Sequence, residues 1–326
     1  MSRGKSFVWL ALVSWLLLPY PSPAPLIYTP GEGWRYEKVG GEGKWQRSRA
    51  KDQLEVAQTA FDNKKYSLAT RAANRTVKEW PFSDYAPQAQ YLLARCEEMT
   101  GDEERAFKAY QKLLERYPKI TNFEEVVKRQ KEIADQYLAG KWFRLWGFIP
   151  LYSSMDKTTK LYDQIIQNGP YSPVAPQAQI NIGIAQENRW IKDYPAAARA
   201  YERAADRYSD TSLAGEALFR AGDAYSKQSK TAEYDQSISA QAIATYTDFM
   251  TLFPEDGRVP TAQKVIGDLR AEQARGSFEI AQFYEKRHRW TGALVYYNEV
   301  LLKDSESKLA DEARKRIAAL KARLGL

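Results

Sequence analysis

Two stretches of this chain order their apolar and polar residues in almost the same way. SDYAPQAQYLLA begins at Ser83, and SPVAPQAQINIG begins at Ser172. In both, small and apolar residues recur three or four positions apart after an Ala-Pro pair, which is the spacing of one face of an α-helix. Proline in the first turn of a helix leaves no hydrogen bond unmade. Each stretch therefore predicts a joint, at which one element ends and a helix begins.

A longer repeat contains both stretches. A small residue is followed twelve positions later by a second small residue, four positions further by an aromatic residue or alanine, and often eight positions further by proline. The four copies without insertions place at the first three positions Ala57, Ala69 and Ala73; Ala94, Ala106 and Tyr110; Ala185, Ala197 and Tyr201; and Ala281, Ala293 and Tyr297. The two copies with insertions place there Ala134, Thr158 and Tyr162, and Ala221, Ala242 and Tyr246.

This spacing is typical of two antiparallel helices that meet at small residues, because a small side chain lets the second helix approach and the aromatic ring fills the space beside it. One such hairpin cannot bury its apolar face alone, so hairpins of this kind stack in arrays. The pattern resembles the tetratricopeptide repeat. We therefore expect an all-α fold, a right-handed α-solenoid of about six tetratricopeptide-like helical hairpins. The amphipathic stretch SESKLADEARKRIAALKARL predicts a C-terminal capping helix.

The N-terminal sequence differs from the repeats. Two positive residues precede the largely apolar segment Phe7–Leu18, which is shorter than the roughly 20 residues that span a bilayer. We interpret residues 1–24 as a signal peptide or N-terminal anchor. The Gly- and Pro-rich residues 25–47 predict an extended tether, in which Trp34 and Trp45 are candidate anchors.

Residues 48–326 are then the helical array, which is interrupted by an aromatic insertion at residues 140–157. A connection with so much apolar surface needs a cover. The flanking helices can cover it as a local satellite core, a protein partner can dock on it, or it can contact a lipid interface, which Trp, Tyr, Lys and Arg together favour. The candidate partner or membrane contacts in the insertion are Trp142, Phe143, Trp146, Phe148 and Tyr152.

The net charge of the chain and its single histidine and cysteine indicate which kinds of partner and activity to expect. The net charge of +7 is spread along the chain, which suits an anionic surface or an acidic protein better than nucleic acid, so we expect no nucleic-acid partner. His288 and Cys96 are the only residues of their kinds, and neither stands in a catalytic or metal-binding pattern. We therefore expect no cofactor and no enzymatic activity.

Three stretches resemble the BamD (YfiO) family more closely than a generic tetratricopeptide repeat requires. They are PFSDYAPQAQYLLARCEEMTGDEERAFKAYQKLLERYP, YSPVAPQAQINIGIAQE and GSFEIAQFYEKRHRWTGALVYYNEVLLKDSESKLADEA. The resemblance implies a non-enzymatic scaffold of the outer-membrane β-barrel assembly machinery, with the barrel insertase and other subunits of the machinery as partners and unfolded outer-membrane proteins as further partners. It also implies a location in the periplasm, associated peripherally with the inner face of the outer membrane. Members of the family are typically lipoproteins, whereas no cysteine follows Phe7–Leu18 to carry a lipid.

Two other functions are compatible with the sequence. Similar repeats occur in periplasmic adaptors of the Tol system and of cell-wall synthesis enzymes. A subunit of a secretion or polysaccharide-export enzyme, with the array as its recognition arm, is a third interpretation.

Overall fold

In the computed structural model the chain forms two compact units, which we call unit 1 (Met1–Phe123) and unit 2 (Glu124–Leu326). The predicted segment 1–24 and the side chains of Trp146 and Phe148 lie outside the residues that the structure describes. The described residues are 26–31, 33–36, 45–145, 149–152, 154–188, 191–231 and 236–326.

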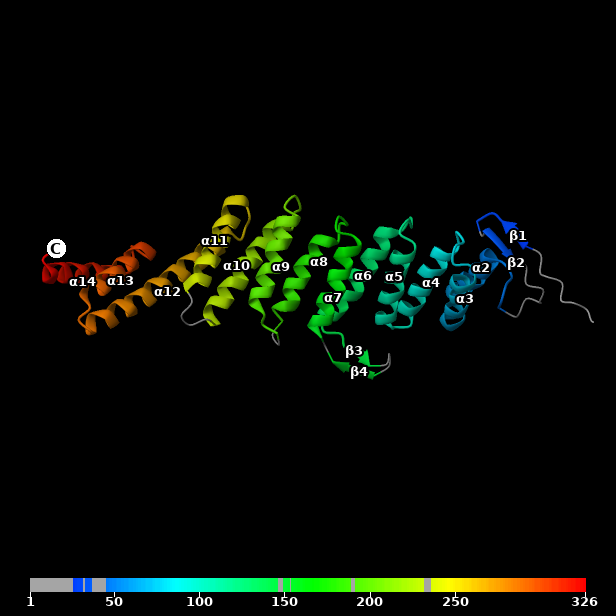
Figure 1. The fold of residues 1–326 in the computed structure, drawn as a ribbon, viewed down its shortest axis with the longest axis horizontal. Helices are drawn as coiled ribbons and strands as arrows, with labels where there is room; N and C mark the ends of the chain where they lie inside the picture. Colours follow the sequence, from blue (N-terminus) through cyan, green and yellow to red (C-terminus); the bar gives the residue numbers. More distant parts are fainter. Residues whose placement is uncertain are drawn as a thin grey trace, which may run out of the picture. The chain divides into compact units, whose positions relative to one another are not determined.

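Unit 1 contains two helical hairpins preceded by a short β-hairpin (Figure 1). The β-hairpin lies within the predicted tether, and its strands pair in antiparallel orientation. Each helix packs on the next one along the chain. The elements are β1 (Leu26–Thr29), β2 (Gly33–Tyr36), α2 (Ala50–Asp62), α3 (Tyr66–Glu79), α4 (Ala86–Met99) and α5 (Glu103–Arg116).

From α7 onward, unit 2 continues the same packing of consecutive helices (Figure 1). The first helix, α6, begins at the unit boundary, and a second β-hairpin separates it from α7. The elements are α6 (Phe123–Leu138), β3 (Phe143–Leu145), β4 (Ile149–Tyr152), α7 (Met155–Asn168), α8 (Ala175–Gln186), α9 (Tyr194–Arg207), α10 (Ala214–Thr231), α11 (Gln236–Leu252), α12 (Val259–Lys286), α13 (Trp290–Lys303) and α14 (Lys308–Leu324).

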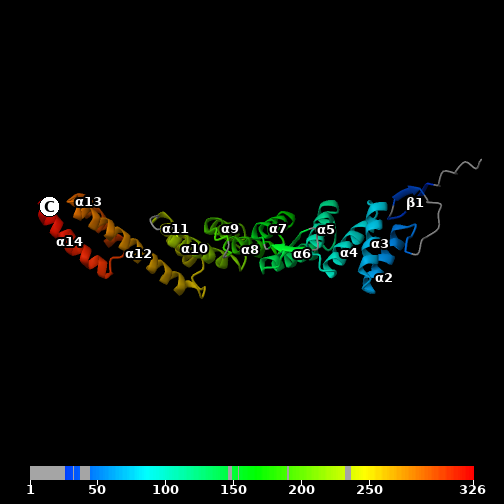
Figure 2. The same ribbon diagram turned by 90° about the horizontal axis from the view of Figure 1, so that it is seen from below.

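The predicted all-α repeat solenoid is confirmed. Thirteen helices form six consecutive hairpins and a final helix within the described residues. That final helix, α14, packs on α13 and on α12, as Figure 2 also shows. Unpredicted are the two short β-hairpins, which lie before the first helix and in the aromatic insertion.

The small and aromatic residues of the repeat lie in the core. The repeat positions in both units have no exposed side-chain surface, including Ala57, Ala69, Ala94, Ala106, Tyr110, Ala185, Ala197, Tyr201, Ala281, Ala293 and Tyr297. Alanine is a strong helix former and also allows a close crossing, so local preference and packing favour the same structure.

The repeated Ala-Pro-Gln-Ala-Gln phrase makes the same hydrogen bond in both units, inside the hairpin that begins at the joint. In unit 1, Gln90 Nε2 donates to the backbone oxygen of Ala109 on α5 at 3.0 Å. In unit 2, Gln179 Nε2 donates to the backbone oxygen of Ala200 on α9 at 3.2 Å. Both glutamines are buried, so the bond satisfies polar groups that water does not reach. The second glutamine of the phrase therefore ties the two helices of its hairpin together.

Four repeat tyrosines make a second recurring contact. Each hydroxyl donates to a carboxylate on the first helix of its own hairpin. Burial of the rings, together with these carboxylates, raises the pKa of Tyr162, Tyr246 and Tyr297 above the usual value. The bonds join Tyr110 to Glu98 at 2.7 Å, Tyr162 to Asp135 at 2.7 Å, Tyr297 to Glu285 at 2.6 Å, and Tyr246 to Asp223.

Two glycines of unit 2 allow the tyrosine ring to approach the helix backbone. A Cβ atom at Gly183 on α8 would overlap the ring of Tyr201, and one at Gly222 on α10 would lie 2.8 Å from Tyr246 Cε1. By contrast, a Cβ atom at Gly267, which is exposed on α12, would meet nothing within 4 Å.

We expect Gly183→Ala to lower the free energy of unfolding by about 1–3 kcal/mol, because the added methyl group overpacks the crossing with Tyr201. The matched control is Gly267→Ala, which we expect to raise that free energy by about 0.5–1 kcal/mol through helix propensity alone. Urea unfolding followed by circular dichroism measures both. Equal effects in the two variants would contradict the close crossing.

We also expect stability to fall above about pH 10, because the folded state holds tyrosine protons that the unfolded chain, with its ordinary tyrosine pKa, releases. The raised pKa values of Tyr162 and Tyr297 mean that their contribution is complete below that pH and is lost as the pH rises further. The double variant Tyr162→Phe, Tyr297→Phe should show a smaller decline in urea midpoint between about pH 8 and about pH 11. Tyr171→Phe, whose ring is 94% exposed, should decline as the parent protein does.

Candidate partner-binding surfaces

The aromatic insertion forms the β3–β4 hairpin between α6 and α7 of unit 2, and Figure 1 shows it extending beyond the helices. Its strands are antiparallel, with Arg144 opposite Pro150 and Leu145 opposite Ile149. The register is irregular between Phe143 and Arg144. Such an irregularity turns neighbouring side chains in new directions, which separates the environments of the residues at the base of the hairpin.

Phe143 and Trp142 have opposite environments. The ring of Phe143 is buried and stacks on Tyr137 of α6, with centroids 4.0 Å apart and an interplanar angle of 7°. The Lys157 ammonium lies 5.1 Å from the same ring. Trp142, in contrast, is 56% exposed. The base of the insertion thus packs locally, while Trp142 faces solvent. Trp146 and Phe148 lie outside the described residues, as does the side chain of Tyr152, and the predicted partner or membrane contact stays a prediction.

Two further aromatic residues, which we call the joint aromatics, are more exposed than any in the insertion that the structure describes. Phe82 in unit 1 and Tyr171 in unit 2 are each 94% exposed. They occupy equivalent positions, between a proline and the serine of the repeated phrase. The serines themselves, Ser83 and Ser172, are buried and close the same turn. The turn therefore points the preceding aromatic ring outward.

Neighbouring contacts hold both joints in place. In unit 1 the hydroxyl of Tyr117 donates to the backbone oxygen of Pro81 at 3.0 Å. In unit 2 Ser172 Oγ donates to Glu124 Oε2 at 2.5 Å. The exposure of the joint aromatics is not predicted from the repeat, because the repeated phrase indicates only a structural joint. The Pro-aromatic-Ser order before the phrase is the signal that identifies them.

The β1–β2 hairpin adds aromatic surface near the joint of unit 1. Tyr28 and Trp34 lie opposite each other on its strands with ring centroids 5.3 Å apart, and both are exposed. The backbone oxygen of Gly31 in the hairpin turn accepts a hydrogen bond from the Asp84 amide at 2.7 Å. This contact fixes the hairpin beside the loop that carries Phe82.

Trp45, the other candidate anchor, packs on the first helical hairpin. It lies against the apolar core of α2, α3 and α4, and the Arg71 guanidinium lies 5.7 Å from its ring. Gln53 Nε2 donates to the Trp45 backbone oxygen at 3.2 Å. Of the two tryptophans, only Trp34 is available to a partner.

Among the described residues, Cys96, His288 and the carboxylates carry the potential metal ligands. No group of three His, Cys, Asp or Glu side chains among them has the geometry of a metal site. Burial raises the pKa of the Cys96 thiol, which makes the reactive thiolate rarer. His288 is exposed and its ring contacts that of Trp290. Within the described residues, no helix combines the length and the apolar character required to cross a bilayer.

Solved structures that are similar to this chain include tetratricopeptide proteins. A thermophilic tetratricopeptide protein of Thermus thermophilus is 16% identical over 67% of this chain and 99% of its own, with a TM-score of 0.29. A tetratricopeptide repeat protein of Parabacteroides merdae is 11% identical over 82% and 98%, with a TM-score of 0.32. PilF of Pseudomonas aeruginosa is 12% identical over 82% and 96%, with a TM-score of 0.31. At these scores the similarity does not bear on function. No curated protein sequence matches the chain.

Family profiles match both units. A tetratricopeptide repeat profile matches residues 54–119, which contain most of the two helical hairpins of unit 1. The YfiO profile, described as outer membrane lipoprotein, matches residues 153–326, which contain α7 to α14 and make up more than half of the chain. Both are families of non-catalytic scaffolds, so the chain has the fold of a protein-interaction scaffold. The resemblance seen in the sequence is confirmed, and the chain belongs to the YfiO family of outer membrane lipoproteins.

Proposed function

We propose that this protein is a non-enzymatic periplasmic scaffold of the outer-membrane β-barrel assembly machinery. It binds the barrel insertase and other subunits of the machinery at the inner face of the outer membrane, and it also holds unfolded outer-membrane proteins. The observation that carries the proposal is the YfiO match over residues 153–326, which contains α7 to α14 of unit 2.

The joint aromatics are the residues that we assign to protein partners. An aromatic side chain brings a large apolar area to an interface and loses little conformational freedom on binding. Phe82 and Tyr171 leave almost all of this area uncovered. Because the buried serine and the hydrogen-bonded turn after each ring hold the loop, a partner would not have to order it.

Each joint aromatic also suits a contact with an extended segment of an unfolded barrel protein. The strands of such proteins alternate apolar and polar residues, so an extended segment presents its apolar side chains on one side. An exposed ring at a rigid joint gives one of these side chains a contact. Folding into a barrel pairs the backbone of the segment with neighbouring strands and turns its apolar side chains to the lipid, which removes them from the ring and thereby releases the segment.

We expect the full chain, purified from its native envelope in mild detergent, to retain the barrel insertase. Tyr171→Ser should weaken that retention about tenfold or more, because a central aromatic anchor contributes about 2 kcal/mol to an interface. The control is Leu252→Ser, which removes an exposed apolar side chain at the end of α11. Quantitative mass spectrometry of the retained proteins, together with the thermal midpoint of each variant, separates loss of binding from loss of folding.

Two results would contradict this proposal. Retention of peptidoglycan synthases or Tol proteins without the insertase would assign the scaffold to the cell wall. Equal retention by the parent protein and both variants would remove the joint aromatic from the interface.

A further inference from the structure

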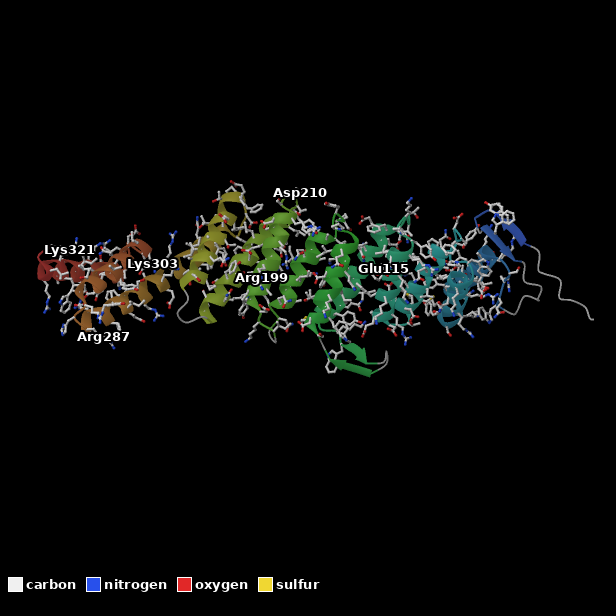
Figure 3. The ribbon with its side chains drawn as sticks, viewed as in Figure 1. Glu115, Arg199, Asp210, Arg287, Lys303 and Lys321 are labelled. Carbon is white, nitrogen blue, oxygen red and sulfur yellow. The ribbon has the colours of Figure 1, made fainter. Side chains whose placement is uncertain are left out.

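The turns of unit 2 lie at two opposite edges. In a row of antiparallel hairpins, the turns within hairpins lie at one edge, which we call the tip edge, and the connections between hairpins lie at the other, which we call the joint edge. Figure 1 shows the β3–β4 hairpin below the helices of unit 2. Figure 3 shows Arg287, in the α12–α13 turn, on that lower side and Asp210, in the α9–α10 connection, on the upper side.

The two edges carry opposite charge. At the joint edge the sequence places Asp210, Glu255, Asp256, Asp304 and Glu306 in the connections. Arg258 is the one basic residue that the sequence places in these connections. It forms an ion pair with Asp256, in which Arg258 Nη2 lies 2.6 Å from Asp256 Oδ2. The cation of this edge is therefore neutralised by an acid of the same loop.

At the tip edge basic residues stand next to tryptophan. In the sequence, three turns have this arrangement: Lys141-Trp142, Arg189-Trp190 with Lys192, and Arg287-His288-Arg289-Trp290; in the second of them the acid Asp193, the N-cap of α9, follows Lys192. The α10–α11 connection differs, since Glu233 and Asp235 lie in it. Of the residues that the structure describes in these turns, Trp142, Lys192, Arg287 and Arg289 are exposed.

The α12–α13 tip is the most basic of the turns. Lys286, Arg287, His288 and Arg289 are consecutive and all exposed. A fourth cation, after Lys286, Arg287 and Arg289, reaches the tip from α14, where the Arg323 guanidinium lies 4.2 Å from the centroid of the Trp290 ring. Within the described residues no ion pair neutralises these cations.

Aromatic rings accompany the cations of this tip. The Arg287 guanidinium lies 4.3 Å from the ring centroid of Phe283, which is itself 51% exposed. The neighbouring acid, Glu285, is occupied by the Tyr297 hydroxyl at 2.6 Å and by Arg316 at 3.4 Å. The tip therefore presents positive charge and apolar ring surface together.

Stability of the fold does not require this arrangement. Arg289 is the N-cap of α13 without a side-chain capping bond, and a cation at that end of a helix opposes the helix dipole. His288 and Lys192 adopt left-handed backbone conformations with φ of 57° and 50°. At the two tips of unit 1, Lys64 and Gly101 adopt this conformation. A residue with a Cβ atom costs about 1–2 kcal/mol there relative to its right-handed conformation. The tips therefore keep side chains where glycine would be favoured.

We propose that the tip edge of unit 2 lies against a phosphate-bearing lipid surface. Lysine and arginine attract anionic headgroups, and tryptophan prefers the interface between headgroups and acyl chains. The cations are placed at separate hairpin tips along one edge, which fits an extended planar surface, whereas an acidic peptide would need them gathered around one groove. The predicted membrane contact of Trp142 is part of this edge. This lipid contact is additional to the scaffold function. Retention of the insertase tests the scaffold function and vesicle binding tests the lipid contact, so either can fail without the other.

The test is flotation of the full chain with vesicles of phosphatidylcholine alone or mixed with phosphatidylglycerol. Arg287→Glu with Arg289→Glu should weaken binding to the anionic vesicles about tenfold or more, because each basic residue near an anionic surface adds to the electrostatic free energy of binding, and each reversal also adds repulsion. The matched control, Lys264→Glu with Lys308→Glu, changes the net charge equally at exposed sites outside the tip edge and should bind as the parent protein does. The N-terminal apolar segment is common to all variants, so their differences report on the edge.

A nitroxide label gives a second measurement that does not depend on the variants folding equally well. Thr291 adjoins the basic tip and Ser305 lies at the joint edge, and both are exposed, whereas the native Cys96 is buried. On anionic vesicles, a label at Thr291→Cys should lose accessibility to a water-soluble relaxation agent, and a label at Ser305→Cys should not.

The lipid assignment is overturned if both charge-reversed variants bind the vesicles equally, or if the label at position 291 stays as accessible as the label at position 305. It is also overturned if the parent protein ignores the vesicles and the tip cations instead bind polyglutamate, which would assign the edge to an acidic protein.

Discussion

The close crossing of two helices at a small residue is the constraint on which the rest of the fold depends. A tyrosine ring fills the space that an alanine or glycine leaves, and Gly183 and Gly222 show how near the ring comes to the backbone. The ring also carries a hydroxyl group, which needs a partner once it is removed from water. In four of the hairpins Glu98, Asp135, Asp223 and Glu285 supply that partner from the first helix, so one side chain there satisfies both the steric and the polar requirement.

The sequence predicts the hairpins well because the crossing tolerates few residue types at fixed spacing. Ala94, Ala106 and Tyr110 show that spacing in the sequence, and the structure buries all three. The carboxylate partners are harder to foresee. They follow the small residue by one, two or four positions, because a hydroxyl at the end of a long ring reaches several positions on the facing helix.

The repeat pattern predicts neither the two β-hairpins nor which aromatic residues are exposed. The Thr-Pro-Gly-Glu-Gly stretch between β1 and β2 signals a turn, but the same composition is typical of an unstructured tether. Trp142 and Phe143 are adjacent and both apolar, and only the position of Tyr137 on α6 decides which of them is buried. Phe82 and Tyr171 look like joint residues in the sequence, and their exposure follows from the turn geometry of the serine after them.

The hydrogen bonds of Gln90 and Gln179 have a consequence for how this scaffold diversifies. Each glutamine holds a backbone oxygen of the facing helix rather than a side chain. This hydrogen bond therefore does not depend on which side chain the accepting residue carries. The outward-facing side chains of the second helix are not needed to hold the hairpin together. During evolution, substitutions on that outward face can change the binding specificity while the glutamine bond preserves the hairpin.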